Sequence, residues 1–363
     1  MFGTYRFALA VSVVLSHFCG VPILGWLAVS GFFVLSGYLM TLVMQRAYGY
    51  HGRGVARFAA NRVLRLYPAW WVTMGVAALV IAGVGADAAR TFDPLMRLPD
   101  AAGSWAAHIA LVFLGSAGAV DTSSQAATAF APHLSPPAWS LTVELAFYAV
   151  IALGASRTPR ATLVWLALAL LYTVGTFALG AGAHWRYGAL GAGALPFAVG
   201  AGLFHLLREP PDRAARALRS VDARIWSVVA LTLCALLTVG IMGGRSPDGG
   251  GADFWGLFYL NIALNALVIA VLALRGRARA GGWDERLGDV SYPLYLLHMP
   301  VGLGLSVWVL GRAERVADLA SLGLAAMTVA ACCALAELIA RAVDAPVAPW
   351  RDRLRSPGLA GRG

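Results

Sequence analysis

The chain has 363 residues, of which 59% are hydrophobic and only 13% are charged. Its formal net charge is +10, and because it contains no lysine, all 28 basic residues are arginines. A composition this apolar excludes an ordinary water-soluble domain and indicates an integral membrane protein whose solvent is the lipid bilayer. The arginines cluster between apolar runs without interleaved aromatic residues, so the basic charge does not indicate nucleic-acid binding.

Apolar runs long enough to cross a bilayer recur along the whole chain, since a spanning helix needs about 20 apolar residues. We predict an all-α bundle of about ten transmembrane helices in one domain over 1–345, followed by a basic cytoplasmic tail at 346–363. A further apolar run at 105–117 is too short to cross and is predicted to be re-entrant or interfacial. The predicted spans are 5–22, 26–45, 67–86, 137–154, 161–180, 187–207, 225–243, 254–274, 290–311 and 319–341.

The distribution of arginine predicts the topology. With both termini in the cytoplasm, most arginines lie on the cytoplasmic side, as the positive-inside rule requires. The largest extracytoplasmic excursion is then 87–136, where an acceptor could enter. Residues 1–19 could also be a signal peptide. We favour an uncleaved first span, because Arg6 and His17 then have a role. The six arginines assigned to the outside are Arg90, Arg97, Arg186, Arg245, Arg312 and Arg315.

The first span contains a basic residue and an imidazole on one helix face. His17 follows Arg6 by eleven positions, which is three turns plus about 20° of rotation and about 16 Å of rise. With Arg6 at the cytoplasmic interface, His17 lies near the bilayer midplane, where an ionisable residue suggests function. A neutral imidazole can take a proton from a hydroxyl group near neutral pH. The alternative is a histidine that only hydrogen-bonds between helices.

The second span carries GFFVLSGYLM, Gly31 to Met40, which places Ser36 and Tyr38 in the middle of the span. Gly31 and Gly37 permit a neighbouring helix to approach closely. Packing is therefore the first interpretation of this run.

The segment between the second and third spans is strongly basic, and it ends at Tyr67 and Pro68. Guanidinium groups suit phosphates, so we expect this cytoplasmic loop to hold the phosphates of a coenzyme A donor. Topology or anionic lipid would also explain the charge. Arg62 and Arg65 are the more specific pair, because three residues apart they share a face if helical. The five arginines are Arg46, Arg53, Arg57, Arg62 and Arg65.

The run PAWSLTVELAFY, Pro137 to Tyr148, places Glu144 in an otherwise apolar helix, with Trp139 and Ser140 one turn or more before it. A buried carboxylate needs a partner or a proton. Glu144 is expected to orient an imidazole, carry a proton or brace a helix pair.

The run SYPLYLLHMPV, Ser291 to Val301, places Tyr295 and His298 three residues apart in one span. Such a polar stripe on one helix face can hydrogen-bond the donor or the histidine of the first span. Interhelical packing is the alternative.

The four cysteines lie inside apolar runs at spacings that fit neither zinc sites nor disulfide frameworks. We therefore expect no metal. They are Cys19, Cys234, Cys332 and Cys333.

Five runs together resemble the acyltransferase 3 family of membrane acyltransferases, in the order of that family and over nearly the whole transmembrane core. Each run is weak evidence alone, whereas five in order are specific. They are Arg6 with His17, GFFVLSGYLM, RVLRLYP at 62–68, PAWSLTVELAFY and SYPLYLLHMP.

The resemblance implies an enzyme of the bacterial cytoplasmic (inner) membrane. Its co-substrate would be cytoplasmic acyl-CoA, expected to be acetyl-CoA, and its acceptor a hydroxyl of a sugar, a polysaccharide precursor, a lipid-linked carbohydrate or a small metabolite. His17 matches the proposed catalytic histidine of the family, and Glu144 matches the acidic position after its Trp-Ser signature. The residues expected to bind the donor are Arg6, Arg62, Arg65 and Tyr67. The residues expected to contact the substrate or support the site are Ser36, Tyr38, Trp139, Ser140, Tyr295 and His298.

One departure from the family is Leu145, where many members carry a second acid. No hydrolase-like domain is expected after Arg341. The rival interpretation is a transporter or flippase of a lipid-linked sugar, because intramembrane histidine and glutamate also serve proton relays. Within the enzymatic interpretation, direct transfer with His17 as general base and a covalent acyl-histidine relay both stay open.

Overall fold

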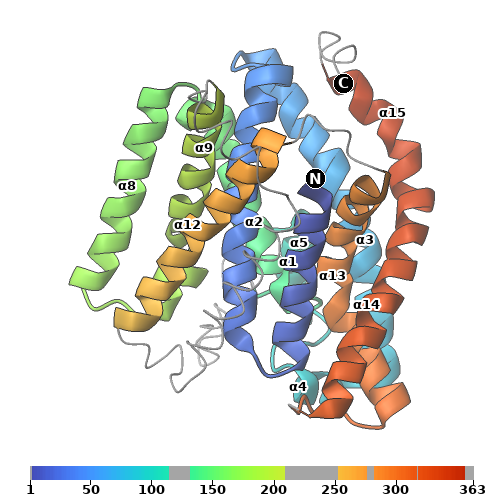
Figure 1. The fold of residues 1–363 in the computed structure, drawn as a ribbon. Coiled ribbons are helices and arrows are strands. Elements are labelled where there is room, and N and C mark those ends of the chain that lie inside the picture. Colours follow the sequence, from blue (N-terminus) through green and yellow to red (C-terminus); the bar gives the residue numbers. More distant parts are fainter. Residues whose placement is uncertain (1, 114–130, 209–251, 276–281, 317, 356–363) are drawn as a thin grey trace.

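The computed structural model describes residues 2–113, 131–208, 252–275, 282–316 and 318–355. Throughout these residues the regular structure is helical, with no strand, and eight helices are long and apolar enough to cross a membrane. The chain is therefore an all-α, multi-pass membrane protein, and its surroundings are a lipid bilayer. Its helices pack side by side in a bundle (Figure 1). The predicted span at 225–243 and residues 114–117 of the short segment lie outside the described residues.

Nine helices correspond to predicted spans. Eight of them, α7 and α9 together with their adjoining turns, form the spans of sufficient length, and α1, with 17 residues, is shorter than these. The nine are α1 (Phe2–Phe18), α2 (Pro22–Val43), α3 (Gly52–Val84), α7 (Trp139–Val150), α8 (Pro159–Ala178), α9 (Ala194–Arg208), α12 (Ala252–Arg275), α13 (Gly282–Leu310) and α14 (Leu319–Ile339). The short helices are α4 (Ala86–Phe92), α5 (Ala102–Ala110) and α15 (Ala345–Leu354). The π-helical turns η1 (Met44–Tyr48), η3 (Ile151–Ala155) and η7 (Ala340–Asp344) continue α2, α7 and α14, and a fourth, η4 (His184–Gly188), precedes α9. The 3₁₀ turns are η2 (Pro136–Ala138) and η5 (Leu190–Gly193).

The prediction that 46–66 is a loop is wrong for most of its length, because α3 begins at Gly52. His51 caps this helix, its Nδ1 accepting a hydrogen bond from the Gly54 amide at 3.1 Å. Pro68, expected at the start of the span, lies inside α3. Hydropathy locates only the apolar part of a helix, and α3 begins before that part with a basic segment. Arg62 and Arg65 consequently share a helix face, as expected if that stretch were helical.

α1 and α13 begin together and run in the same direction. The Asp284 carboxylate accepts hydrogen bonds from the amides of Gly3 at 3.2 Å and Thr4 at 3.0 Å, and from the Thr4 hydroxyl at 2.8 Å. A Cβ at Gly3 would lie 1.7 Å from the Asp284 carbonyl oxygen, so only glycine permits this approach. The contact fixes the register between the two helices.

α2 and α9 also meet through glycine. A Cβ at Gly37 would lie 2.2 Å from the Phe197 carbonyl oxygen, and one at Gly200 would lie 2.0 Å from the Val34 carbonyl oxygen. The predicted packing role of Gly37 is therefore confirmed, with α9 as its partner.

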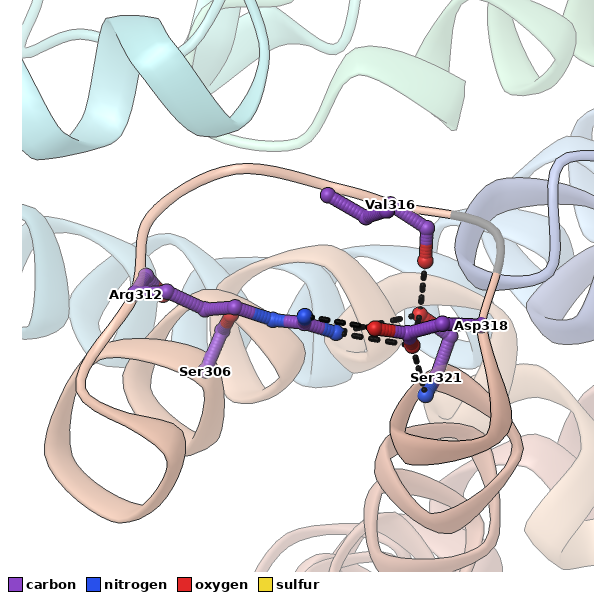
Figure 2. A network of polar contacts seen from close by, with 5 residues as sticks. All are labelled: Ser306, Arg312, Val316, Asp318 and Ser321. Carbon is purple, nitrogen blue, oxygen red and sulfur yellow. Dashed lines mark hydrogen bonds and ion pairs between the residues drawn. The ribbon is translucent and has the colours of Figure 1, made fainter.

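The connection between α13 and α14 is held by a polar network (Figure 2). Arg312 pairs with both carboxylate oxygens of Asp318, at 2.7 and 3.0 Å, and Asp318 caps α14 by accepting from the Ser321 amide at 2.8 Å. These bonds hold the pKa of Asp318 well below its usual range, because Arg312 and Ser321 both stabilise the carboxylate. The Ser321 hydroxyl also donates to the Val316 carbonyl. The turn is thus tied across both helix ends.

Two short elements pack against α3. The α5 helix ends at Ala110 and is followed by Leu111, which has a left-handed φ of 55°. The Tyr67 hydroxyl donates to the Ala110 carbonyl at 2.8 Å. Nearer the start of α3, Asn61 donates to the Arg351 carbonyl at 3.0 Å, so the segment predicted as a tail begins as the packed helix α15.

Candidate active site

A cavity of about 90 Å³ lies between α1, α2, α3, α7 and α13. Most of its polar lining comes from side chains that the sequence singled out. These are Arg6, Ser36, Arg62, Arg65, Ser140, Glu144 and Tyr295. Sequence runs separated by up to about 290 positions therefore meet at one site.

Glu144 is the carboxylate in this lining. The Ser36 hydroxyl donates to its Oε1 at 2.6 Å, and the Tyr148 hydroxyl donates to the same oxygen. Within the described part of the chain no donor is assigned to Oε2. Hydroxyl donors to a charged acceptor form strong hydrogen bonds, so α2 and α7 hold Glu144 in one orientation.

The three arginines of the lining differ in how their charge is balanced. Arg65 pairs with Asp289 at 3.3 Å and with Asp344 at 3.6 Å. Arg62 donates to the Asn61 amide oxygen at 2.6 Å, and among the described residues no carboxylate lies within 4.0 Å of it. Arg6 likewise makes no such pair there. The lining therefore carries more positive than negative charge, which attracts an anion.

Tyr295 connects the cavity to the start of α7. Its hydroxyl lies 2.7 Å from the Ser140 hydroxyl, and both hydroxyl groups lie 3.0 Å from the Pro137 carbonyl oxygen. The two hydroxyl groups and the carbonyl oxygen thus provide one another with hydrogen-bond partners. These bonds fix the Tyr295 ring at the edge of the cavity.

His17 and His298 are paired with each other but do not belong to the cavity lining. Their ring centroids are 5.2 Å apart, in the last turn of α1 and the middle of α13. Both follow the Gly3 to Asp284 contact by fourteen positions, and parallel helices keep such residues at one level, about 21 Å along. The Tyr295 side chain lines the cavity, and its ring lies 6.0 Å from that of His298.

Asp93, Ser135 and Arg315 form polar contacts next to this pair. Arg315 donates to the Asp93 carboxylate at 3.0 Å and to the His17 carbonyl at 3.5 Å. Burial raises the pKa of Asp93, and the nearby Arg315 opposes that rise. The Ser135 hydroxyl donates at 3.0 Å to the Leu296 carbonyl, the group that Pro300 leaves without its helical donor.

Besides His17 and His298, three expected site residues lie outside the cavity lining. Tyr38 contacts Phe2 and Phe204, and Trp139 contacts Phe33 and Tyr187, in both cases through ring packing. Tyr67 instead binds α5 through its hydroxyl. The structure does not bring these three together with the arginines and Glu144.

Sequence reasoning missed Tyr148, Asp93 and Arg315. Tyr148 could have been found, because it lies one helical turn after Glu144, where side chains meet. Asp93 and Arg315 are separated by 222 positions, in the segments that follow α4 and α13, so no local signal joins them. Across the described residues, no group of three histidine, cysteine or acidic side chains could hold a metal ion.

A family model for an acyltransferase domain matches residues 4–337. The chain belongs to the acyltransferase 3 family. The match spans α1 to α14 and so includes every residue of the cavity lining. No curated protein and no solved structure matches this acyltransferase.

Proposed function

We propose that this acyltransferase moves an acyl group, acetyl in the first instance, from acyl-CoA in the cytoplasm to a hydroxyl of a sugar, a polysaccharide precursor or a small metabolite. The observation that carries the proposal is the cavity, in which Arg6 and Arg62 have no carboxylate partner among the described residues and Glu144 supplies the carboxylate of the lining. The family match favours this chemistry over transport. The proposed setting is the cytoplasmic membrane of a bacterium, with both termini inside.

The size of the cavity supports a donor that enters only in part. A volume of about 90 Å³ holds a few water molecules or the slender end of a pantetheine arm, but not a nucleotide. The phosphates would then remain near the basic end of α3, where Arg62 and Arg65 lie. Guanidinium groups bind phosphate oxygens through paired, charge-assisted hydrogen bonds.

In the proposed reaction, His17 accepts the proton of the acceptor hydroxyl while the oxygen of that hydroxyl attacks the thioester carbonyl. The new bond joins the acceptor oxygen to the acyl carbon. The carbon–sulfur bond breaks, and the proton held by His17 passes to the departing thiolate of coenzyme A. Glu144, fixed by Ser36 and Tyr148, is proposed as the second catalytic group. Its carboxylate would orient the arginine side chains that line the path of the donor.

The route from the cavity to His17 passes Tyr295. Its side chain lines the cavity and its ring also contacts that of His298, so rotation of this ring would join the cavity to the histidine pair. Tyr38, Tyr67 and Trp139 are proposed only to support the helices around this path.

A cell-free assay tests the proposal with purified protein in lipid nanodiscs, radiolabelled acetyl-CoA and an extract of envelope glycans and lipid-linked sugars. We expect label in the acceptor fraction with the native protein and loss of that label in His17→Ala. His51→Asn is the control, because it removes an imidazole and retains a residue that caps helices well. Full turnover in His17→Ala would exclude His17 as the base.

Single-turnover labelling without acceptor separates the two chemical routes. Label bound to the protein supports an acyl-histidine relay, whereas its absence favours direct transfer.

A further inference from the structure

His298 carries a buried nitrogen that the structure leaves without a partner. Its side chain is completely buried, and its Nδ1 lies 2.8 Å from the Tyr295 carbonyl oxygen. A carbonyl oxygen can only accept, so Nδ1 must carry the proton of the neutral ring. Nε2 is then an acceptor, and no described residue donates to it. Buried acceptors without a donor are costly, which indicates that a donor belongs there.

The surroundings of the His298 ring limit what that donor can be. The neighbouring rings are those of Phe18, Tyr295 and His17. Phe18 has no polar atom, and the Tyr295 hydroxyl is bound to Ser140 and Pro137. The His17 ring, with its centroid 5.2 Å away, has an N–H to give and no hydrogen bond of its own within the described part of the chain.

We propose that His298 is a positioning residue whose Nε2 accepts a hydrogen bond from a ring N–H of His17. The bond fixes the tautomer of His17, so that its other nitrogen keeps a lone pair facing the acceptor hydroxyl. When that nitrogen takes the proton, the positive charge on His17 is stabilised by the lone pair of His298. The inference rests on the proposed role of His17 as base and adds the group that orients it.

The backbone supports this arrangement independently. The Gly3 to Asp284 contact sets α1 and α13 in a register that brings the two rings to one level. Arg315 holds the end of α1 through the His17 carbonyl, and Ser135 holds α13 through the Leu296 carbonyl. Both helix segments are therefore fixed at the height of the pair.

Two substitutions of His298 separate its two nitrogens. The amide nitrogen of asparagine can replace Nδ1 and donate to the Tyr295 carbonyl, but asparagine offers no acceptor at the place of Nε2. The amide oxygen of glutamine can reach that place and accept from His17. We expect His298→Asn to lower kcat about 10- to 100-fold with an unchanged KM for acetyl-CoA, and His298→Gln to retain most of the activity.

The pH profile adds a readout that a purely structural role would not move. The charged and titratable groups around the pair are His17 itself, Arg315 with its partner Asp93, and Tyr295. In His298→Asn the hydrogen-bond acceptor Nε2 is missing, so protonated His17 loses stabilisation. The acidic limb of the kcat profile therefore moves to lower pH. Glutamine cannot change its charge over this range and leaves the limb near its native position.

The opposite ranking, an active asparagine variant and an inactive glutamine variant, would show that His298 acts through the Tyr295 carbonyl and would overturn the inference. Full activity in both variants would do the same. If His17→Ala is also fully active, the proposed role of His17 as base fails as well, whereas an inactive His17→Ala leaves that role standing, and label in the acceptor fraction with the native protein supports acyl transfer in either case.

Nitrogen NMR on the native protein with 15N-labelled histidine decides the case if both variants misfold. We expect His298 with its proton on Nδ1 and His17 in a single tautomer, assigned by comparison with His17→Ala. Rapid exchange of His17 between tautomers would contradict the hydrogen bond.

Discussion

Replacing Arg62 with glutamine should weaken the binding of acyl-CoA without disturbing the fold. Arg62 lines the cavity, and within the described residues its charge has no carboxylate partner. A charge-assisted hydrogen bond contributes about 1.5–3 kcal/mol. Because each 1.4 kcal/mol is about tenfold in affinity, the dissociation constant of acetyl-CoA should rise roughly 10- to 150-fold.

Arg53→Gln is the matched control, since Arg53 is an exposed residue at the same end of α3 and lies outside the cavity lining. Isothermal titration of acetyl-CoA into protein in nanodiscs measures both variants, with thermal unfolding to check that each is folded. Equal dissociation constants for Arg62→Gln and the native protein would refute the reasoning. Equal weakening in both variants would mean that only the total charge of this surface matters.

Three further predictions concern packing and the edge of the site. Gly37→Ala forces a Cβ against the α9 backbone and should destabilise the protein by about 1–3 kcal/mol, measured by thermal unfolding in detergent, whereas Gly75→Ala, with nothing within 4 Å, should not. Ser135→Ala leaves a carbonyl of α13 without a donor and should cost about 1–3 kcal/mol in a denaturant titration, so an unchanged midpoint would contradict that bond. Arg351→Gln removes a partly exposed charge near Arg62. Because an exposed charge interaction contributes about 0.2–1 kcal/mol, the dissociation constant of acetyl-CoA should rise by no more than about fivefold.

Features that depend on local chemistry could be predicted from the sequence. The apolar windows located helices, the shared face of Arg62 and Arg65 followed from their spacing, and the small residue Gly37 indicated a close helix pair. The start of α3 was mispredicted for a physical reason: hydropathy reports the part of a helix that fits the bilayer, and a helix can continue beyond it. The same limit shortened α13, which begins at Gly282 rather than 290.

Features that depend on register could not be predicted. The pairing of His17 with His298 follows from the contact between Gly3 and Asp284, 281 positions apart, and nothing local to either histidine encodes it. The sequence therefore left open whether the stripe on α13 served the donor, the first histidine or packing. In the structure Tyr295 and His298 divide between two places, the first in the cavity lining and the second beside His17.

This division bears on how a membrane enzyme can keep its two substrates apart. Arg62 and Arg65 of the cavity lining belong to the basic first half of α3, whereas His17 lies in the last turn of α1 beside Arg315 and Asp93, which lie in the segments that follow α13 and α4. A donor held by arginines and an acceptor arriving from the other side would meet only across the Tyr295 ring. Water would be excluded from the thioester until that ring moves, so acyl-CoA hydrolysis without acceptor should be slow relative to transfer. Comparable rates of hydrolysis and transfer would mean that the ring does not separate the two sides.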